Sequence, residues 1–373
     1  MRRSLSVLVL VVLAALLGAN LAASATTQND SSCRKNLTAP FDSMEMMSYE
    51  ACRFDKIDAQ VAALKAGTST PTASPSASAP ASPQPSASSA PPTSSPTPST
   101  PTSPAPSTPT SPAPSTSAPS TALPGPTNTG VRDGTTLTAY SGPATITTAG
   151  TVIENKSITS CIVIKANNVI IRNSLISSNG CFFNVLSDNG NTGLQLVDVE
   201  VDGRGNLGGD SAINGGGLTC LRCDLHGTVD GIKAQSNVVV QDSWIHDLAI
   251  GNDSHNDGIQ SLGTTSLKVL HNRIVMADGA TSAVILSTGS ADAMRNVQID
   301  GNYLGGGAFT VYGGYQAGTD ALSKVSNISI TNNKFTTSVF ARGGAYGALT
   351  STDSPVVTTG NTWADGAKAG QAV

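Results

Sequence analysis

Two phrases in the second half of the chain hold most of the residues that could do chemistry. Residues 226–235 read HGTVDGIKAQ and residues 252–261 read NDSHNDGIQS. Aligning their shared Asp-Gly-Ile places Asp230 over Asp257 and Lys233 over Gln260. Paired carboxylates can act as general acid and general base, and their oxygens can bind calcium. The two phrases therefore predict a site for acid–base or calcium-assisted chemistry.

Two kinds of reaction fit these residues. In a hydrolysis, Asp257 and either Asp230 or Asp253 would form the acid and base pair, and His255 would tune them. In an elimination, Lys233 or His255 would remove a proton next to a uronate carboxylate. Calcium bound by Asp230, Asp253 and Asp257 would then neutralise that carboxylate. The residue types leave both reactions open.

Other polar and aromatic side chains accompany the two phrases. Asn214 falls in the alignment column of Lys233 and Gln260, and His226 and His246 share a second column with Asp202. We expect the following side chains to contact a substrate: Asn214, His226, Trp244, His246 and Gln260.

Each of these residues also has a purely structural explanation. Aspartate before glycine is common in turns, and an isolated lysine or histidine usually lies on a solvated surface. Two aspartates stacked about 4.8 Å apart, however, repel each other unless a proton or a cation lies between them. We therefore interpret Asp230 and Asp257 as functional. If the fold encloses both carboxylates away from solvent, a non-catalytic extracellular module becomes the better interpretation.

A recurring phrase, apolar-x-apolar-x-x-(Asn/Ser)-x-apolar, must position these residues. Its sixth positions lie 18 to 31 residues apart, a period that is typical of a solenoid. Apolar residues at the first and third positions alternate with polar ones, which predicts short β-strands rather than helices. Asparagine at four consecutive sixth positions predicts a buried ladder of stacked amides at a corner. The nine copies are TVIENKSI, VIIRNSLI, LQLVDVEV, LTCLRCDL, VVVQDSWI, LKVLHNRI, VQIDGNYL, ISITNNKF and VVTTGNTW.

Phrases such as VIIRNSLI and ISITNNKF resemble the repeats of the pectate-lyase-like superfamily. The resemblance covers roughly residues 139–365 and implies an all-β, single-stranded, right-handed parallel β-helix. The NDGI phrase at 256–259 is similar to the N-T-D-G-I/F phrase of polygalacturonases, in which the aspartate is catalytic. The double-aspartate repeat and the R-I-K phrase that accompany it in polygalacturonases are absent here.

The chain before the repeats divides into three parts. Residues 1–25 combine two arginines, an apolar run and small residues, as in a secretory signal peptide, so we expect a secreted protein. Residues 26–67 form a small segment with a short helix, and export makes a disulfide between Cys33 and Cys52 the natural pairing. Residues 68–130 are rich in Pro, Ser and Thr, which predicts a disordered linker.

Residues 131–373 form the expected β-helix domain. They carry 14 Lys and Arg against 19 Asp and Glu, a net charge of −5, and no basic stripe, so a nucleic-acid partner is excluded. Cys161 and Cys181 begin equivalent strands, which places them within disulfide reach of each other. Cys220 and Cys223 are expected to be core thiols or a local disulfide.

The resemblance implies a monomeric, secreted, carbohydrate-active enzyme. It would cleave a uronate-containing polysaccharide or cell-wall glycan by β-elimination or hydrolysis, with calcium as the cofactor of an elimination. The alternative is a non-catalytic glycan-binding or cell-surface module, because the fold alone does not determine function.

Overall fold

The computed structural model describes residues 122–187, 190–251, 254–289 and 293–373. The segments expected at 1–25 and 26–67, most of the linker, and the Cys33–Cys52 pair lie outside these residues. Regular structure in the described part is almost wholly β, with two short 3₁₀ helices, η2 (Leu322–Lys324) and η3 (Gly366–Lys368). None of its helices has the length and apolar character that a membrane crossing requires.

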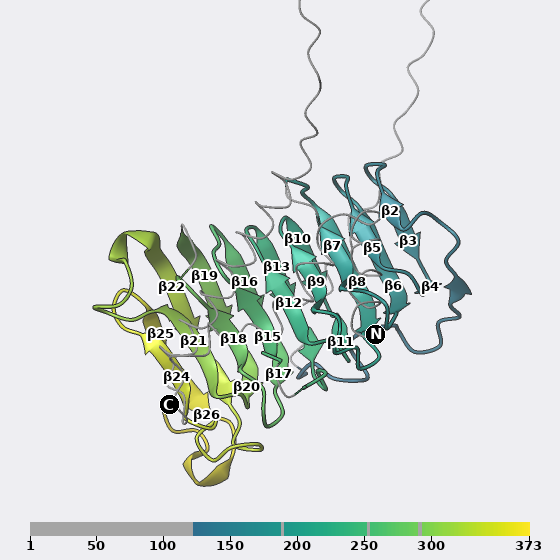
Figure 1. Cartoon of the computed structure of the whole chain (residues 1–373). Coiled ribbons are helices and arrows are strands. Elements are labelled where there is room, and N and C mark those ends of the chain that lie inside the picture. Colours follow the sequence, from purple (N-terminus) through teal and green to yellow (C-terminus); the bar gives the residue numbers. More distant parts are fainter. Residues whose placement is uncertain (1–121, 188–189, 252–253, 290–292) are drawn as a thin grey trace, which may run out of the picture.

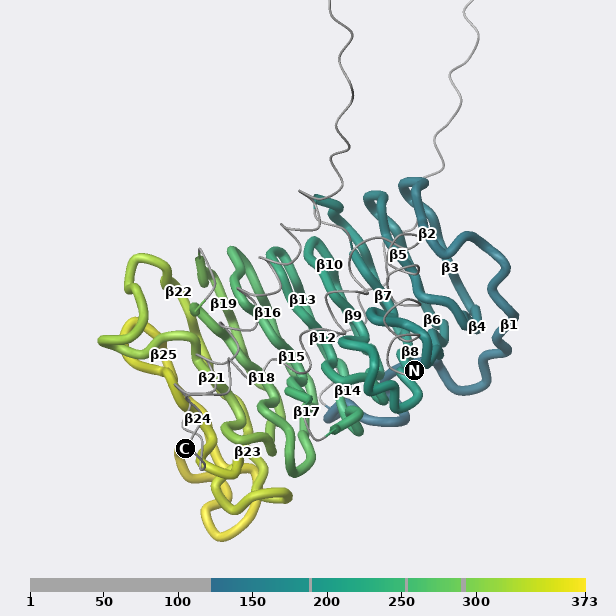
Figure 2. The backbone as a smooth tube through the Cα atoms, viewed as in Figure 1, coloured from purple at the N-terminus to yellow at the C-terminus, as the bar shows by residue number. Residues whose placement is uncertain are grey.

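Seven of the nine copies of the recurring phrase form two strands that are separated by a corner. In one repeat, β13 (Val238–Gln241) and β14 (Trp244–Ile245) flank the corner, and a loop then leads to β15 (Asp257–Ser261). β13 and β14 pair with the equivalent strands of the next repeat in one sheet, and β15 pairs in a second sheet. All pairings between named strands are parallel, so successive repeats stack along one axis (Figures 1 and 2).

The first sheet, sheet A, contains seventeen strands on the two sides of the corner. Before the corner lie β3 (Val152–Glu154), β10 (Leu218–Leu221), β13, β16 (Leu267–Leu270), β19 (Met294–Asp300), β22 (Val325–Thr331) and β25 (Val357–Thr359). After it lie β1 (Thr138–Ala139), β4 (Lys156–Ile158), β11 (Asp224–His226), β14, β17 (Arg273–Val275), β20 (Tyr303–Gly305), β23 (Lys334–Phe335) and β26 (Thr362–Trp363). Two longer strands, β6 (Ile170–Ser177) and β8 (Leu194–Asp202), run through the corner and join both sides.

The second sheet, sheet B, contains nine strands. They are β2 (Thr145–Ile146), β5 (Ile162–Ile164), β7 (Phe183–Ser187), β9 (Ser211–Gly215), β12 (Asp230–Ala234), β15, β18 (Ser282–Leu286), β21 (Phe309–Tyr315) and β24 (Gly347–Thr352). Figure 1 shows these strands side by side in chain order, from the blue end of the molecule to the yellow end.

The core lies between the sheets and is built from the apolar positions of the phrase. One column of third-position side chains pairs from repeat to repeat and is fully enclosed. Enclosing each aliphatic side chain of this kind contributes about 1.5–3 kcal/mol, so the repeats stabilise one another. The column consists of Ile171, Leu196, Cys220, Val240, Val269, Ile299 and Ile330, all at 0% exposure.

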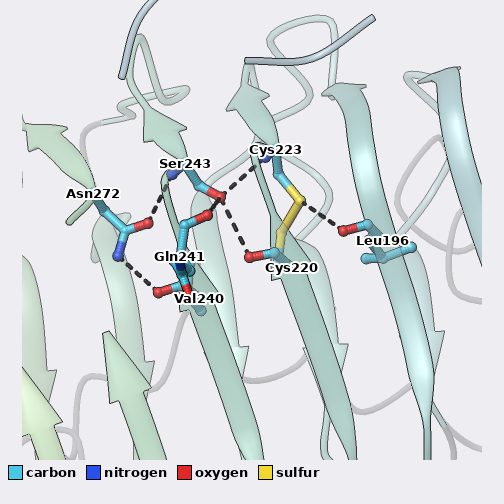
Figure 3. Close-up of a disulfide and its surroundings, with 7 residues drawn as sticks. All are labelled: Leu196, Cys220, Cys223, Val240, Gln241, Ser243 and Asn272. Atoms are coloured by element: carbon cyan, nitrogen blue, oxygen red, sulfur yellow. Dashed lines mark hydrogen bonds between the residues drawn. A yellow bond between two sulfur atoms is a disulfide. The ribbon is translucent and has the colours of Figure 1, made fainter. Parts of the chain in front are cut away.

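The predicted asparagine ladder is present at the corner. The Asn302 side-chain amide donates to Val269 O at 2.8 Å, and its Oδ1 accepts the Asn272 backbone N–H at 2.8 Å. Asn333 and Asn361 repeat this arrangement in the following repeats. In Figure 3, Ser243 continues the ladder, because it donates its N–H to Asn272 Oδ1 at 2.9 Å and accepts the Cys223 N–H at 3.0 Å.

Both expected cysteine pairs of the described domain are disulfide-bonded. Cys161 and Cys181 are joined with a Cα–Cα distance of 5.4 Å, as predicted from their positions in neighbouring repeats. Cys220 and Cys223 form a local disulfide around the corner, which decides between the two expectations for that pair (Figure 3).

The chain packs on sheet A from residue 122 onward, before the expected end of the linker at 130. The segment 122–135, which we call the strap, crosses from Gly125 beside Arg273 to Gly130, which donates its N–H to Arg222 O at 2.8 Å (Figure 2). Arg132 then forms two bonds to Asp198, at 2.9 and 2.6 Å. The strap therefore lies along several repeats before the first strand begins.

Candidate functional site

The register of sheet B places Asp230 and Asp257 at the same position of neighbouring strands. β12 and β15 pair with Ile232 opposite Ile259 and Lys233 opposite Gln260, as the alignment of the two phrases predicts. The Asp257 backbone N–H donates to Asp230 Oδ1 at 2.8 Å. The predicted stacking of the two aspartates is therefore confirmed.

The Asp-Gly pair turns these carboxylates to the outer side of sheet B. A Cβ added to Gly231 would lie 2.8 Å from the core side chain of Ile245, so the glycine occupies the inner side. Asp230 lies on the other side with Lys233, whose Nζ is 3.4 Å from Asp230 Oδ2. In the next repeat, Gln260 Nε2 donates to Asp257 Oδ2 at 3.2 Å, which is the same contact three residues apart.

The two aspartates that were expected to act on a substrate are buried. Asp230 is 2% exposed and Asp257 is 0% exposed, and Gln260 beside them is also buried. Directly before Asp257, Asn256 Nδ2 donates to Val229 O and Ala249 O, which holds the chain at the entry to β15 against the entry to β12. Both aspartates are therefore enclosed, which is the condition under which the sequence favours a non-catalytic module.

Lys233 is held between two carboxylates. Its Nζ lies 2.8 Å from Asp210 Oδ2 and 3.4 Å from Asp230 Oδ2, and the side chain is 22% exposed. Two negative partners stabilise the charged ammonium, which opposes the role of a proton-abstracting base. Asn214, in the column of Lys233, accepts a bond from Gln235 Nε2 at 3.4 Å. These half-buried groups form the more accessible part of the cluster.

The column that contains the aspartates is polar in four repeats and aromatic at both ends. Ser282 lies opposite Asp257, and its hydroxyl is 2.5 Å from Asp257 Oδ1. Ser211 lies opposite both Asp230 and Phe183. By continuation of the register, Phe309 follows Ser282. Four consecutive repeats therefore have a polar residue at a strand position where the repeats on either side have phenylalanine. We call these four residues the polar tetrad: Ser211, Asp230, Asp257 and Ser282.

His226, Trp244 and His246 lie on sheet A, around a bend from the aspartates. The Trp244 and His246 rings stack with centroids 3.4 Å apart, as expected for neighbouring outward side chains. His246 contacts Asp224 at 2.8 Å and Asp247 at 2.7 Å. The predicted substrate contacts are thus divided between two sheets, because β11 and β14 end before the chain turns into β12 and β15.

The surroundings of His226 favour its protonated form. Its Nε2 lies 3.4 Å from Glu200 Oε1 and its Nδ1 lies 3.7 Å from Asp202 Oδ1. The hydrogen bond with Glu200 raises the pKa of His226 above its usual value, against the opposing effect of burial. His226 thus belongs to a group of charged side chains on sheet A, together with Glu200 and Asp202.

The calcium expectation gains no support from the described residues. No group of three or more His, Cys, Asp or Glu in the described part of the chain is arranged to hold a metal ion. Asp253, one of the three expected ligands, lies outside that part. His255 is half-buried, two residues before Asp257.

Sequence reasoning missed Asp210 and Ser282. Asp210 is the residue before β9 in a glycine-rich loop, so no repeat position marks it. Ser282 belongs to SAVIL, a segment that reads as apolar. Ser282 falls in the same alignment column as Asp230 and Asp257, and this shared column could have identified it from the sequence.

Comparison with known protein families, with curated proteins and with solved structures finds no match to this chain.

Proposed function

We propose that the protein is an exported glycan-binding module built on a right-handed parallel β-helix. The glycan would lie on the outer side of sheet B, over β9, β12 and β15. Parallel strands joined by crossovers are right-handed in almost all proteins, which supports the handedness. The signal-like residues 1–25 and the two disulfides of the described domain support export.

The observation that carries the proposal is a charged cluster on a surface where the fold does not need one. Phe183 and, by continuation of the register, Phe309 occupy the same column as Asp230 and Asp257, so an apolar side chain is compatible with that position. Burying two carboxylates costs stability unless they are paired and hydrogen-bonded. Here Asp230 contacts the partly exposed Lys233, and Asp257 accepts a hydrogen bond from Gln260. Buried groups that fix the side chains beside them are expected of a preorganised binding site.

Burial of the carboxylates favours binding over cleavage. At 0% and 2% exposure, Asp257 and Asp230 cannot contact a scissile bond in this conformation. Their spacing of one repeat, about 4.8 Å, is also shorter than the roughly 6.5–9.5 Å that an inverting pair of carboxyls requires.

A sedimentation assay with insoluble polysaccharides tests this proposal. The secreted protein would be mixed with acidic, neutral and amino-sugar polymers, and depletion from the supernatant would be measured. Asn214→Ala should weaken binding about tenfold, because its amide lies in the proposed surface. Asn327→Ala is the matched control, since Asn327 is an exposed asparagine on sheet A. Equal binding by both variants, or binding to no polymer, would reject the proposal.

The second candidate is a polysaccharide-cleaving enzyme that uses the same cluster. It is favoured by the adjacent carboxylates and the 2.5 Å contact between Ser282 and Asp257, because two neighbouring carboxyls tend to retain a proton that an acid catalyst could donate. New reducing ends, or ultraviolet absorbance from an unsaturated uronate end, would establish this activity. Loss of that product in a folded Asp257→Asn variant would assign the reaction to this site.

A further inference from the structure

We infer that the glycan bound on sheet B carries protonated amino groups, as in a polymer of amino sugars. This inference rests on the proposed function and names the class of its ligand. It departs from the uronate polymer that the resemblance implies.

Carboxylates outnumber ammonium groups in this cluster. Asp210 and Asp230 both contact Lys233 Nζ, at 2.8 and 3.4 Å, and Asp257 lies beside Asp230. A uronate would add a carboxylate to this excess and be repelled, whereas an ammonium would reduce it. The net charge of −5 over residues 131–373 acts in the same direction.

Two buried polar atoms lie at the start of β9. Asp210 Oδ1 is buried and has no hydrogen-bond partner among the described residues, although Oδ2 of the same carboxylate contacts Lys233. The Ser211 side chain is 0% exposed, and its Oγ likewise has no partner in the described part of the chain. Buried polar atoms are normally satisfied, so a missing donor is expected here.

The type of missing donor distinguishes the ligand classes. An ammonium offers three donors and no acceptor, which suits an unpaired carboxylate oxygen. An ionised uronate is an acceptor only and cannot satisfy Asp210 Oδ1. Lys233 already shows how the cluster receives an ammonium, with contacts of 2.8 and 3.4 Å to two carboxylates. An amino sugar would place a second ammonium in the same environment.

Binding to soluble chitosan, its N-acetylated form and polygalacturonate, measured by calorimetry at mildly acidic pH, tests the inference. Chitosan should bind about tenfold or more tightly than the acetylated polymer, whose nitrogen is uncharged. Asp210→Asn should lose about tenfold in chitosan affinity. The matched control is Asp278→Asn, which removes the same charge from an exposed loop and should bind like the wild type.

Lys233→Met gives the sharpest contrast between ligand classes. A cationic ligand should bind this variant as well as or better than the wild type, because a competing ammonium is gone. A uronate ligand would lose its positive partner and bind worse. Should Lys233→Met fail to fold, Asp210→Asn and Asp278→Asn still decide the matter.

The outcomes separate this inference from the proposed function. Preferred binding of polygalacturonate, or equal chitosan binding by Asp210→Asn and Asp278→Asn, would overturn the amino-sugar inference. If a neutral or acidic polymer binds and Asn214→Ala weakens it, the glycan site stands and only the preference for amines is rejected. Binding to no polymer would reject both.

Discussion

Two buried polar columns run along this molecule, and they differ in regularity and in charge. The asparagine ladder of sheet A repeats over Asn272, Asn302, Asn333 and Asn361, and each amide bonds the backbone of its neighbours. The aspartates of sheet B occupy two consecutive repeats only, with serines and then phenylalanines beyond them. A polar residue that recurs in every repeat serves the fold, whereas one that breaks the pattern requires another explanation.

The two columns also differ in how their polar groups are satisfied. An amide carries a donor and an acceptor, so stacked asparagines satisfy one another indefinitely. Ionised aspartates are acceptors only and repel each other, so their column depends on donors from other residue types. Asp230 contacts Lys233, and Asp257 contacts Gln260 and Ser282. The ladder is therefore built from one residue type, whereas the aspartate column needs several.

The largest expected effect is on the ladder. Asn302→Ala leaves the Asn272 N–H and Val269 O without their partners in the core. We expect the free energy of unfolding to fall by about 3 kcal/mol, because each unsatisfied buried group costs about 1–3 kcal/mol. Urea denaturation measures this loss, and glycan binding of the folded fraction should not change.

Two controls make the ladder result specific. Asn302→Ser should recover part of the stability, since Ser243 already fills a ladder position with its hydroxyl. Asn327→Gly, at an exposed site with a φ of 54° that glycine also adopts, should stay within about 0.5 kcal/mol of the wild type. A loss at Asn327 equal to that at Asn302 would show that the ladder has no special role.

A smaller loss is expected when the cation of the aspartate column is removed. Lys233→Met leaves Asp210 and Asp230 without their ammonium partner, and we expect a loss of about 2 kcal/mol. This is below the roughly 3–5 kcal/mol of a fully buried pair, because solvent screens a side chain that is 22% exposed. Adding Asp210→Asn should restore stability. No restoration in the double variant would mean that Lys233 acts through packing.

The smallest effects are those of pH at surface carboxylates that belong to neither column. The pKa of Asp365 is lowered to about 2, first by Thr336 and then by Thr337, which hydrogen-bond its carboxylate. A lowered pKa gives stability that is present above about 3.8 and is lost as the pH falls towards 2. Asp365→Asn should flatten this part of a stability–pH curve, and an unchanged curve would contradict the assignment.

The pH dependence of stability that we expect from His226 has the opposite sign to that of Asp365. The pKa of His226 is raised by Glu200, so its contribution is fully present below the usual value of 6.5 and is lost as the pH rises through the raised pKa. Glu200→Gln should remove this dependence while leaving the fold intact, as monitored by thermal unfolding between mildly acidic and mildly alkaline pH. A pH dependence that survives the substitution would show that the charges of Asp224 and Asp202, and not Glu200, raise the pKa of His226.

The repeat made most of the architecture predictable. Alternating apolar residues determine which side chains enter the core, and the same spacing predicted the asparagine ladder and the Cys161–Cys181 disulfide. It also aligned Asp230 with Asp257, because parallel register follows the repeat. Features that recur along the chain can be found by aligning the chain with itself.

Features set by the loops were not predictable in this way. Asn256, next to the buried Asp257, bonds to Val229 O in the preceding repeat, and Asp210 approaches Lys233 from a loop without a repeat position. The division of His226 and Asp230 between two sheets depends on a bend of three residues between β11 and β12. No periodicity marks such bends, so the sequence grouped side chains that the fold separates.

The central claim is that the aspartate column exists for a ligand and not for stability. The most direct test replaces both carboxylates, Asp230→Asn with Asp257→Asn, and measures urea unfolding and glycan binding on the same preparation. The account predicts equal or greater stability, because two crowded charges are removed from a buried site, together with loss of binding. A loss of stability as large as that of Asn302→Ala, with glycan binding retained, would contradict it and make this column a second structural ladder.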